Sequence, residues 1–392
     1  MKTVYLDNNA TTKIAPEVFE EMTPYLTELY GNPSSMHTFG GQLHRRLEDA
    51  RSKVASLLNA DPSEIIFTSC GTESDNTAIM SAVESQPRKK HIITTKVEHP
   101  AVLNFCRLLA RKGHKATYLP VDHDGKLSLD DFSKAVDDDT AVVSIMYANN
   151  ETGVIFPIQE IAEYLRERKI TFHTDAVQVV GKIPIDVNKI PIDMLTLSGH
   201  KLHAPKGIGA LYVRKGTRFH PYLIGGHQEK GRRGGTENVA SIIGLGKASE
   251  LALKNHEAET KQLTHLRDKL ENSFLKCCPD VRINGDTKNR LPNTTNISFE
   301  YVEGEAILLR LNEFGICASS GSACSSGSLE PSHVLRAMGI PYTAVHGSIR
   351  FSLSRYNTEE EIDKVIEIMP GIIKELRQLS PFGRDKISCP PQ

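Results

Sequence analysis

Asp193-Met-Leu-Thr-Leu-Ser198-Gly-His-Lys201-Leu-His-Ala-Pro-Lys-Gly-Ile-Gly209 is the stretch that predicts most about the fold of this 392-residue chain. Its apolar beginning indicates a buried strand, and the Gly- and Pro-containing segment that follows indicates a loop. The strand would carry Lys201 to an edge of a sheet, where its amine could meet a bound carbonyl compound. A lysine amine becomes a nucleophile when burial or a neighbouring charge lowers its pKa. The stretch alone does not distinguish such a lysine from one of the chain's solvated lysines.

From residue 64 onward the chain alternates between short apolar runs and amphipathic segments. Helices of about 10–15 residues between strands predict a largely parallel sheet with helices on both faces. The expected fold class is therefore α/β, with a mostly parallel seven-stranded sheet in a large domain. Ligands of such sheets bind beyond the carboxyl ends of the strands. The predicted strands are residues 65–68, 91–95, 116–121, 141–147, 170–174, 194–197 and 209–213. The predicted helices up to this point are residues 16–29, 41–58, 73–85, 100–112, 129–136 and 158–168.

A glycine-rich segment, residues 225–236, precedes a long helical pattern at residues 238–275 that we expect to bridge two domains. We assign residues 16–260 to the large domain, and residues 1–15 with 261–380 to a smaller α+β domain that carries a cysteine loop. Residues 381–392 are expected to form a flexible tail. The elements predicted for the smaller domain are strands 296–299 and 348–352 and helices 304–312, 333–338 and 359–379.

Composition argues against several classes of protein. Charged residues make up 24% of the chain and the net charge is −1, so there is no basic footprint for nucleic acid or an anionic membrane. The N-terminus turns polar at once, unlike a signal peptide, and no run of about 18 apolar residues indicates a membrane span. The seven cysteines include no Cys-x-x-Cys pair, which argues against a disulfide framework or a zinc site. We expect a cytoplasmic protein.

Two polar motifs follow predicted strands as a cofactor site would require. Ser-Cys-Gly71-Thr72-Glu-Ser stands between a strand and a helix, where free N–H groups, a glycine and a hydroxyl can bind a phosphate. The alternative is an ordinary capping box. Asp175 ends another strand, where a carboxylate can hold a pyridine nitrogen protonated, and Gln178 could reach a phenolic oxygen. The alternative for Asp175 is a helix cap.

Two further strand ends carry side chains that suit an aromatic cofactor. His99 follows the strand at residues 91–95 and could stack on a ring and transfer protons, because its unperturbed pKa lies near neutrality. Asn150 follows the predicted strand at residues 141–147 and could contact the same cofactor. A structural histidine and a turn asparagine are the alternatives.

Cys324 and Arg350 lie in the predicted smaller domain. Ala318-Ser-Ser-Gly-Ser-Ala-Cys324-Ser-Ser-Gly-Ser328 surrounds one thiol with small residues, so we expect it on a mobile loop where it is exposed. The alternative is a linker with an incidental thiol. Arg350 stands within an apolar predicted strand, and it therefore needs a carboxylate that is either internal or part of a substrate.

Each of these signals is ambiguous alone, but they occur together along one predicted α/β domain. A phosphate turn, a histidine that can stack, a carboxylate for a pyridine nitrogen and a lysine at a strand end form the set needed to hold pyridoxal phosphate (PLP). The sequence therefore predicts a PLP site built around Lys201.

With these motifs the chain resembles the class V aminotransferase-like, fold type I PLP enzymes, and within them the NifS/IscS-type cysteine desulfurases. The resemblance extends from Tyr5-Leu-Asp-Asn-Asn-Ala-Thr-Thr to Ser348-Ile-Arg-Phe-Ser-Leu-Ser-Arg. Its most specific motifs are Ser198-Gly-His-Lys, followed by Pro-Lys-Gly-Ile-Gly, and Ser-Ser-Gly-Ser-Ala-Cys324. The long cysteine loop is similar to that of the group I enzymes.

The resemblance implies that Lys201 binds PLP covalently and removes the Cα proton of L-cysteine, and that the Cys324 thiolate attacks the substrate sulfur. Alanine and a persulfide on Cys324 would result, and His99 would stack on the ring. The residues implied to bind the cofactor are Gly71, Thr72, Asn150, Asp175, Gln178, Ser198, His200, Lys201 and Thr236. Thr236 would do so for the neighbouring subunit of a homodimer. Those implied to bind the substrate carboxylate are Asn8, Asn150 and Arg350.

The resemblance also implies an acceptor for the sulfur, commonly an iron–sulfur scaffold protein, and a cluster shared with that scaffold could transiently use Cys324 as a ligand. A selenocysteine lyase or a related aminotransferase is the nearest alternative, although transamination needs no thiol such as Cys324. A non-catalytic sulfur-relay or scaffold-binding protein is a further alternative, against which the presence of Lys201, Asp175 and His99 argues. The sequence leaves open which acceptor is used, whether assembly is general or specific to nitrogenase, and what Cys70 and Cys389 do.

Overall fold

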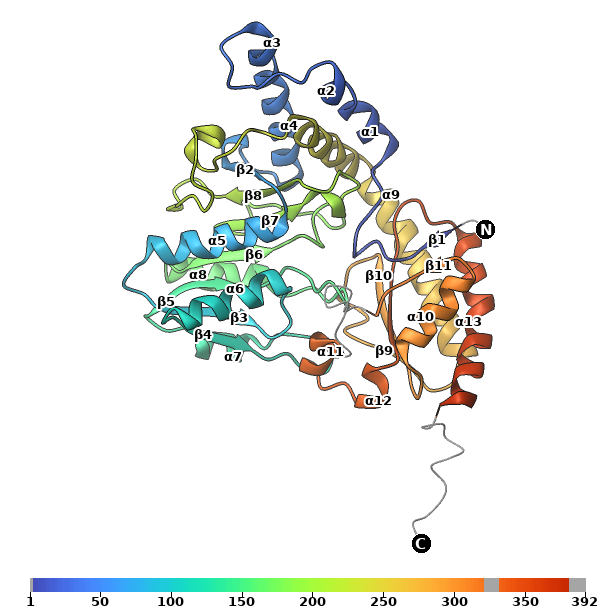
Figure 1. Cartoon of the computed structure of the whole chain (residues 1–392). Coiled ribbons are helices and arrows are strands. Elements are labelled where there is room, and N and C mark those ends of the chain that lie inside the picture. Colours follow the sequence, from blue (N-terminus) through green and yellow to red (C-terminus); the bar gives the residue numbers. More distant parts are fainter. Residues whose placement is uncertain (1–2, 321–330, 381–392) are drawn as a thin grey trace.

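The computed structural model describes residues 3–320 and 331–380. The predictions made for Cys324 and for residues 381–392 therefore lie outside the described residues. Figure 1 shows two packed units, a larger one with a broad sheet and a smaller one drawn mainly in orange and red.

The larger unit is built on one seven-stranded sheet with the strand order β2-β8-β7-β6-β5-β3-β4. The strands from β4 across to β7 pair in parallel, whereas β8 runs antiparallel to both of its neighbours. Only residues 199–208 join β7 to β8, and because a parallel crossover needs about a dozen residues or more, this connection returns antiparallel. The predicted α/β class with a mostly parallel seven-stranded sheet is confirmed. The strands are β2 (Ile65–Thr68), β3 (His91–Thr95), β4 (Lys115–Leu119), β5 (Thr140–Ser144), β6 (Thr171–Asp175), β7 (Met194–Ser198) and β8 (Gly209–Val213).

Helices cover both faces of this sheet because its inner strands are apolar on both sides. On β3, Ile92 packs in the cluster that α5 and α6 cover, and its neighbour Ile93 belongs to the core on the other face, to which α7 and α8 contribute. Alternate residues of one strand thus reach opposite layers. The helices of this unit are α1 (Pro16–Met22), α2 (Pro24–Thr27), α3 (Thr38–Gly41), α4 (Leu43–Leu58), α5 (Gly71–Ser85), α6 (Pro100–Arg111), α7 (Leu129–Ala135) and α8 (Ile158–Glu167).

The long helix α9 (Val239–Cys277) joins the two units (Figure 1). Its first part packs against α1 and α4 in the larger unit, and its second part buries Leu270 and Phe274 in the smaller one. Close packing on α4 requires Gly246, because a Cβ there would lie 2.7 Å from the Cα of Ala50. One continuous helix therefore contributes to both cores.

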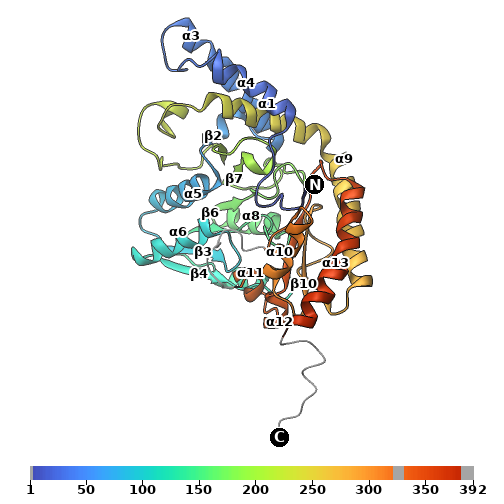
Figure 2. The same ribbon diagram turned by 45° about the vertical axis from the view of Figure 1, so that its right-hand side comes forward.

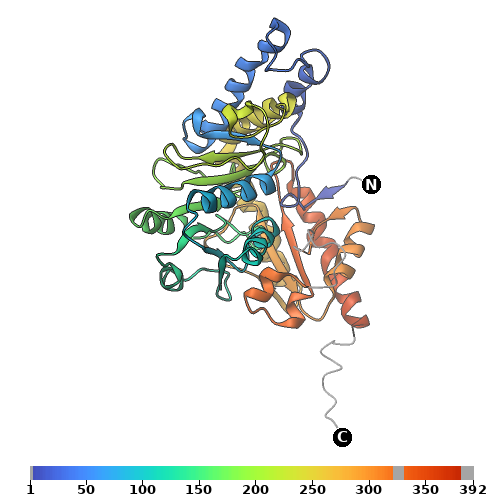
Figure 3. The same ribbon diagram turned by 60° about the vertical axis from the view of Figure 1, so that its left-hand side comes forward.

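The smaller unit combines an antiparallel sheet of order β12-β10-β9 with a parallel pair of β1 and β11. Figure 2 shows α13 beside α9, and Figure 3 shows the dark blue strand β1 against the orange elements of this unit. The N-terminal residues thus lie beside the C-terminal part of the chain. The elements are β1 (Val4–Tyr5), β9 (Val281–Ile283), β10 (Thr294–Phe299), α10 (Gly304–Glu313), β11 (Ile316–Cys317), α11 (His333–Ala337), α12 (Tyr342–Val345), β12 (Ser348–Ser352) and α13 (Glu359–Leu379).

The proposed domain limits stay predictions, and the packing agrees with them only in part. Val4 and Leu6 belong to the smaller core, as expected for residues 1–15, but Leu335 and Ala344 of the predicted smaller domain join the larger core. The single helix predicted for residues 16–29 is wrong, because Pro24 has no N–H to continue α1 and starts α2 instead. Over the described residues, no helix has the length and apolar character that crossing a membrane requires.

Candidate active site

A cavity of about 320 Å³ lies at the carboxyl ends of the parallel strands. The ends of β6 and β7 form its floor, and it is closed by Asn9 and Ala10 of the N-terminal segment and by β12 of the smaller unit. The sequence-predicted residues that it brings together are Gly71, Thr72, His99, Asn150, Asp175, Gln178, Ser198, His200, Lys201 and Arg350. The cavity thus unites residues from seven separate parts of the chain.

One end of the cavity suits an anion. The N-terminus of α5 opens there at Gly71, after Cys70 in extended conformation whose side chain makes no capping bond. The hydroxyl oxygen of Ser198 is buried and has no hydrogen-bond partner in the described part of the chain. A Cβ on Gly71 would lie 3.0 Å from Val177 Cγ2, so the glycine keeps the backbone open to a ligand. Backbone N–H groups, an unpaired hydroxyl and a helix N-terminus together fit a phosphate.

The cavity wall also contains a buried carboxylate, Asp175. Asp175 ends β6, is 7% exposed and accepts a hydrogen bond of 2.9 Å from the Val177 N–H. Burial raises the pKa of Asp175 to about 6, although that N–H and the positive charge of Lys201 oppose the rise. The expected alternative, a local backbone cap, is therefore present, but the carboxylate also faces the cavity. A buried carboxylate of this kind suits a protonated ring nitrogen.

His99 presents a neutral imidazole to the cavity. It is the N-cap of α6, where its Nδ1 accepts a hydrogen bond of 3.1 Å from the Ala101 N–H. The neutral ring must therefore carry its proton on Nε2. The pKa of His99 is lowered to about 4, first by burial and then by the positive charges of Lys201 and His333. At neutral pH His99 can stack on a ring without adding charge.

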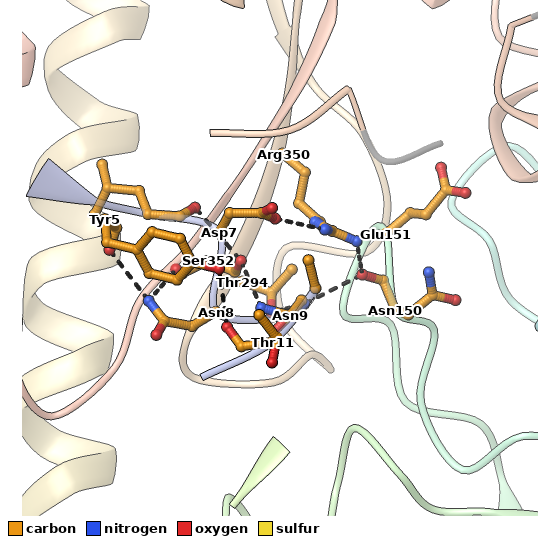
Figure 4. Close-up of polar contacts among 12 residues, drawn as sticks. Tyr5, Asp7, Asn8, Asn9, Thr11, Asn150, Glu151, Thr294, Arg350 and Ser352 are labelled. Atoms are coloured by element: carbon orange, nitrogen blue, oxygen red, sulfur yellow. Dashed lines mark hydrogen bonds and ion pairs between the residues drawn. The ribbon is translucent and has the colours of Figure 1, made fainter. Parts of the chain in front are cut away.

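Lys201 lines the same cavity, in a short turn (Gly199–Lys201) directly after β7. Its ammonium donates to the carbonyl oxygen of Ala10 at 2.7 Å and to that of Asn9. The side chain of Asn9 is itself held by Thr294 Oγ1 at 2.8 Å and by the Asn150 carbonyl at 3.2 Å (Figure 4). The N-terminal segment thus provides fixed hydrogen-bond acceptors for the Lys201 amine.

Arg350 links the same segment to the cavity (Figure 4). It is 2% exposed, donates from Nη2 to Asp7 Oδ1 at 2.7 Å, and donates from Nη1 to the Asn150 carbonyl at 3.0 Å. Of the two carboxylates that the sequence allowed, the structure contains the internal one, Asp7. The Asn8 amide donates to the Tyr5 and Ser352 carbonyls and is not part of the cavity wall, whereas its neighbour Asn9 is.

Thr236 does not line this cavity. Thr236 lines a separate hollow of about 200 Å³, which also contains Arg233. Arg233 binds Glu73, in the first turn of α5, at 3.0 Å. Cys324 lies outside the described residues. Within residues 3–320 and 331–380, no group of three or more His, Cys, Asp or Glu side chains is arranged to hold a metal ion.

Sequence reasoning missed several residues of the cavity wall, of which Asp75 is the most informative. Asp75 lies on α5, is 1% exposed, and its Oδ1 is 3.6 Å from the buried His173 Nε2. Burial and then the charge of Asp175 hold the pKa of Asp75 well above its usual range. Because side chains alternate between the two faces of a strand, the sequence could have placed His173 on the same face as Asp175. Nothing in the sequence distinguishes Asp75 from an ordinary polar residue of a helix. The other residues missed include Asn9, Ala10, Met146, Ala148 and Val177.

The residues present fit PLP. An anion site for a phosphate, a buried carboxylate for a pyridine nitrogen, a neutral histidine and a lysine amine lie around one cavity. The unpaired Ser198 hydroxyl is the clearest sign that this wall is built for a ligand, because buried polar groups are otherwise nearly always hydrogen-bonded.

Residues 4–365 match the family model described as Aminotransferase class-V. The chain is 64% identical over 386 residues to a cysteine desulfurase of Trichormus azollae, a match that covers 98% of this chain and 96% of that protein. It is 60% identical over 383 residues to the cysteine desulfurase NifS of Azotobacter vinelandii, with 97% of this chain and 95% of that one covered. Among solved structures, a NifS-like protein has a TM-score of 0.90 at 40% identity, covering 96% of this chain and 100% of its own. SspA in complex with cysteine has a TM-score of 0.81 at 36% identity, covering 91% and 100%.

Proposed function

We propose, for a chain that belongs to the class-V aminotransferase family and is a PLP-dependent cysteine desulfurase, that Lys201 moves the substrate proton and Cys324 takes the substrate sulfur. The observation that carries the assignment of Lys201 is that it lines one cavity together with an anion site and the buried carboxylate of Asp175. The sequence around Cys324 offers a thiol among small residues. The two roles therefore fall on two separate segments.

The cavity residues would hold PLP by both ends. Ser198, His200 and the backbone at Gly71 and Thr72 would bind its phosphate, and Asp175 would bind its ring nitrogen. Gln178 and Asn150 would face the ring oxygen, and His99 would stack on the ring. When bound, PLP supplies a sink for the negative charge that develops at the substrate Cα.

The chain's own groups account for the proton transfers. Lys201, as a free amine, would remove the Cα proton of L-cysteine, and the carbonyl oxygens of Asn9 and Ala10 would hold its ammonium form. The low pKa of His99 keeps that ring neutral beside Lys201, so it does not repel the ammonium. Arg350 and Asn150 would orient the substrate carboxylate, and Asn8 is proposed to assist by fixing the segment that it belongs to.

The sulfur would leave on Cys324. A bond forms between the Cys324 Sγ and the substrate sulfur, the substrate Cβ–S bond breaks, and its electron pair stays with carbon. Protonation at that carbon, and return of a proton from Lys201 to Cα, would complete L-alanine, so L-cysteine and a thiol become L-alanine and a persulfide. A thiolate is required for this attack, and thiolates form readily only where the thiol is accessible.

Two partners belong to the proposal. A homodimer would allow Thr236, which lies outside the cavity of its own chain, to bind the phosphate of the neighbouring subunit's cofactor. An iron–sulfur scaffold protein would accept the persulfide sulfur, and Cys324 could then transiently bind a shared cluster.

The proposal is tested by separating cofactor binding from desulfuration. The purified protein should show an absorption band near about 400 nm that borohydride removes, because it reports a lysine-bound carbonyl cofactor. Lys201→Ala should lose this band, whereas Cys324→Ala should keep it and form neither alanine nor persulfide from L-cysteine. Cys277→Ala, which removes an exposed thiol at the end of α9, is the matched control and should keep both. Turnover by Cys324→Ala would refute the role of that thiol.

A further inference from the structure

Lys182 is a lysine with a buried ammonium that the proposed chemistry does not use. It lies four residues beyond Gln178 and outside the wall of the cavity. Its stem is partly exposed, but the pKa of Lys182 is lowered to about 7, first by burial and then by the positive charges of Lys201 and Arg350. A cation beside two other cations is costly, so its position needs an explanation.

The ammonium of Lys182 binds two oxygens of a single residue. It donates to the Gln178 carbonyl oxygen at 2.9 Å and to the Gln178 side-chain Oε1 at 3.1 Å. On the other side of the same amide, Nε2 donates to the Asn9 carbonyl oxygen at 3.0 Å. The Gln178 side chain is therefore held between Lys182 and the N-terminal segment, and its NH2 group bonds to Asn9, which lines the cavity with Gln178.

This arrangement determines which way the Gln178 amide faces. The oxygen and nitrogen ends of an amide differ little in size, so packing alone selects weakly between its two orientations. An ammonium can only donate hydrogen bonds, so it can pair with the Oε1 end of the amide but not with the NH2 end. With the amide reversed, its oxygen would also oppose the Asn9 carbonyl oxygen that now accepts from Nε2.

We propose that Lys182 is a positioning residue that orients the Gln178 amide, so that its NH2 group is offered as a donor to the ring oxygen of the cofactor. The inference rests on the proposed function, since it concerns the same cavity. A donor to that oxygen favours its ionised form, whereas an acceptor would oppose it. Lys182 acts on the cofactor through Gln178 and does not touch it.

The test is the affinity of the cofactor-free protein for PLP, measured by absorbance titration. Lys182→Met removes the donor and should weaken PLP binding roughly tenfold, the equivalent of one hydrogen bond to a charged group. Lys182→Arg keeps a donor-only cation and should stay within about threefold of the parent protein. Lys182→Gln, a polar variant for the case that Lys182→Met does not fold, can pair with either amide orientation and should also lose affinity.

A double-mutant cycle shows whether Lys182 acts through Gln178. In a Gln178→Ala background, Lys182→Met should change the PLP affinity by less than about twofold, because no amide remains to be oriented. A full tenfold loss in that background, or no loss in the parent background, would overturn the inference. If the parent protein itself fails to bind PLP, the proposed function fails instead, so the two failures are distinguishable.

Discussion

Asp175→Asn should make the cofactor-free protein more stable and its cofactor binding weaker. The carboxylate is 7% exposed, and burial raises its pKa from 3.8 to about 6. The folded state therefore binds this proton more tightly than the unfolded state does. The contribution of this group to the free energy of unfolding falls as the pH rises from about 4 to about 6. Above that range the loss of stability caused by the buried charge is constant.

The size of the cost follows from the two pKa values. The interval between 3.8 and about 6 corresponds to about 3 kcal/mol in the free energy of unfolding. Asparagine carries no charge but can still accept the hydrogen bond from the Val177 N–H. Asp175→Asn should therefore gain up to about 3 kcal/mol at pH 8 and almost nothing at pH 4. The substitution should also remove the charge repulsion by which Asp175 helps to raise the pKa of Asp75.

Urea unfolding of the cofactor-free parent and variant at pH 8 and pH 4 measures this difference, and a PLP titration at pH 8 measures binding. Binding should weaken by roughly 10- to 100-fold, because a hydrogen bond to a charged group is lost. The two effects have opposite signs, which separates a ligand-binding carboxylate from a structural one. A variant that is less stable at both pH values would refute the reasoning, since Asp175 would then stabilise the fold itself.

Four further substitutions test other parts of the structure. Glu229→Ala removes the buried carboxylate that binds Arg51 at 2.7 and 2.8 Å and leaves the guanidinium only the partly exposed Glu48, which should cost about 3–5 kcal/mol in urea unfolding; a loss below about 1 kcal/mol would contradict this. Gly246→Ala, which forces α9 away from α4, should lower the melting temperature by the equivalent of about 1–3 kcal/mol. Gly371→Ala in α13, where a new Cβ meets no atom within 4 Å, should instead raise stability by about 0.4–1 kcal/mol. Arg350→Lys should raise the KM for L-cysteine at least about tenfold with a smaller effect on kcat, because lysine cannot reproduce the planar pair of donors; equal losses in both would assign Arg350 to the chemical step.

The fold was predictable because its strands are buried on both faces. The seven apolar runs between helical segments are each too short for a helix of their own, so alternation alone indicated the sheet. The antiparallel direction of β8 was not predicted, although the short connection from Ser198 to Gly209 contains the reason. Elements of two to four residues, such as β11 (Ile316–Cys317) and α12 (Tyr342–Val345), have no period to detect and depend on tertiary packing.

The site was predictable where a strand ends in a reactive side chain. Lys201 and Asp175 follow apolar runs directly, so their place at the sheet edge follows from the strand before them. Asn9 could not be assigned in this way, because its importance lies in a backbone carbonyl oxygen that any residue provides. Lys182 was missed because its partner is brought to it by the turn after β6.

The Asn9 carbonyl oxygen explains why the chain's first residues belong to the site. It accepts from the Gln178 amide at 3.0 Å and from the Lys201 ammonium, and the Asn9 side chain is tied to Thr294 in the smaller unit at 2.8 Å. The Lys201 amine and the Gln178 amide are therefore held by a segment that the smaller unit positions. Because Arg350 also comes from that unit, neither unit alone can present the complete cavity. Docking of the two units on either side of residues 7–10 is thus a condition for the complete cavity.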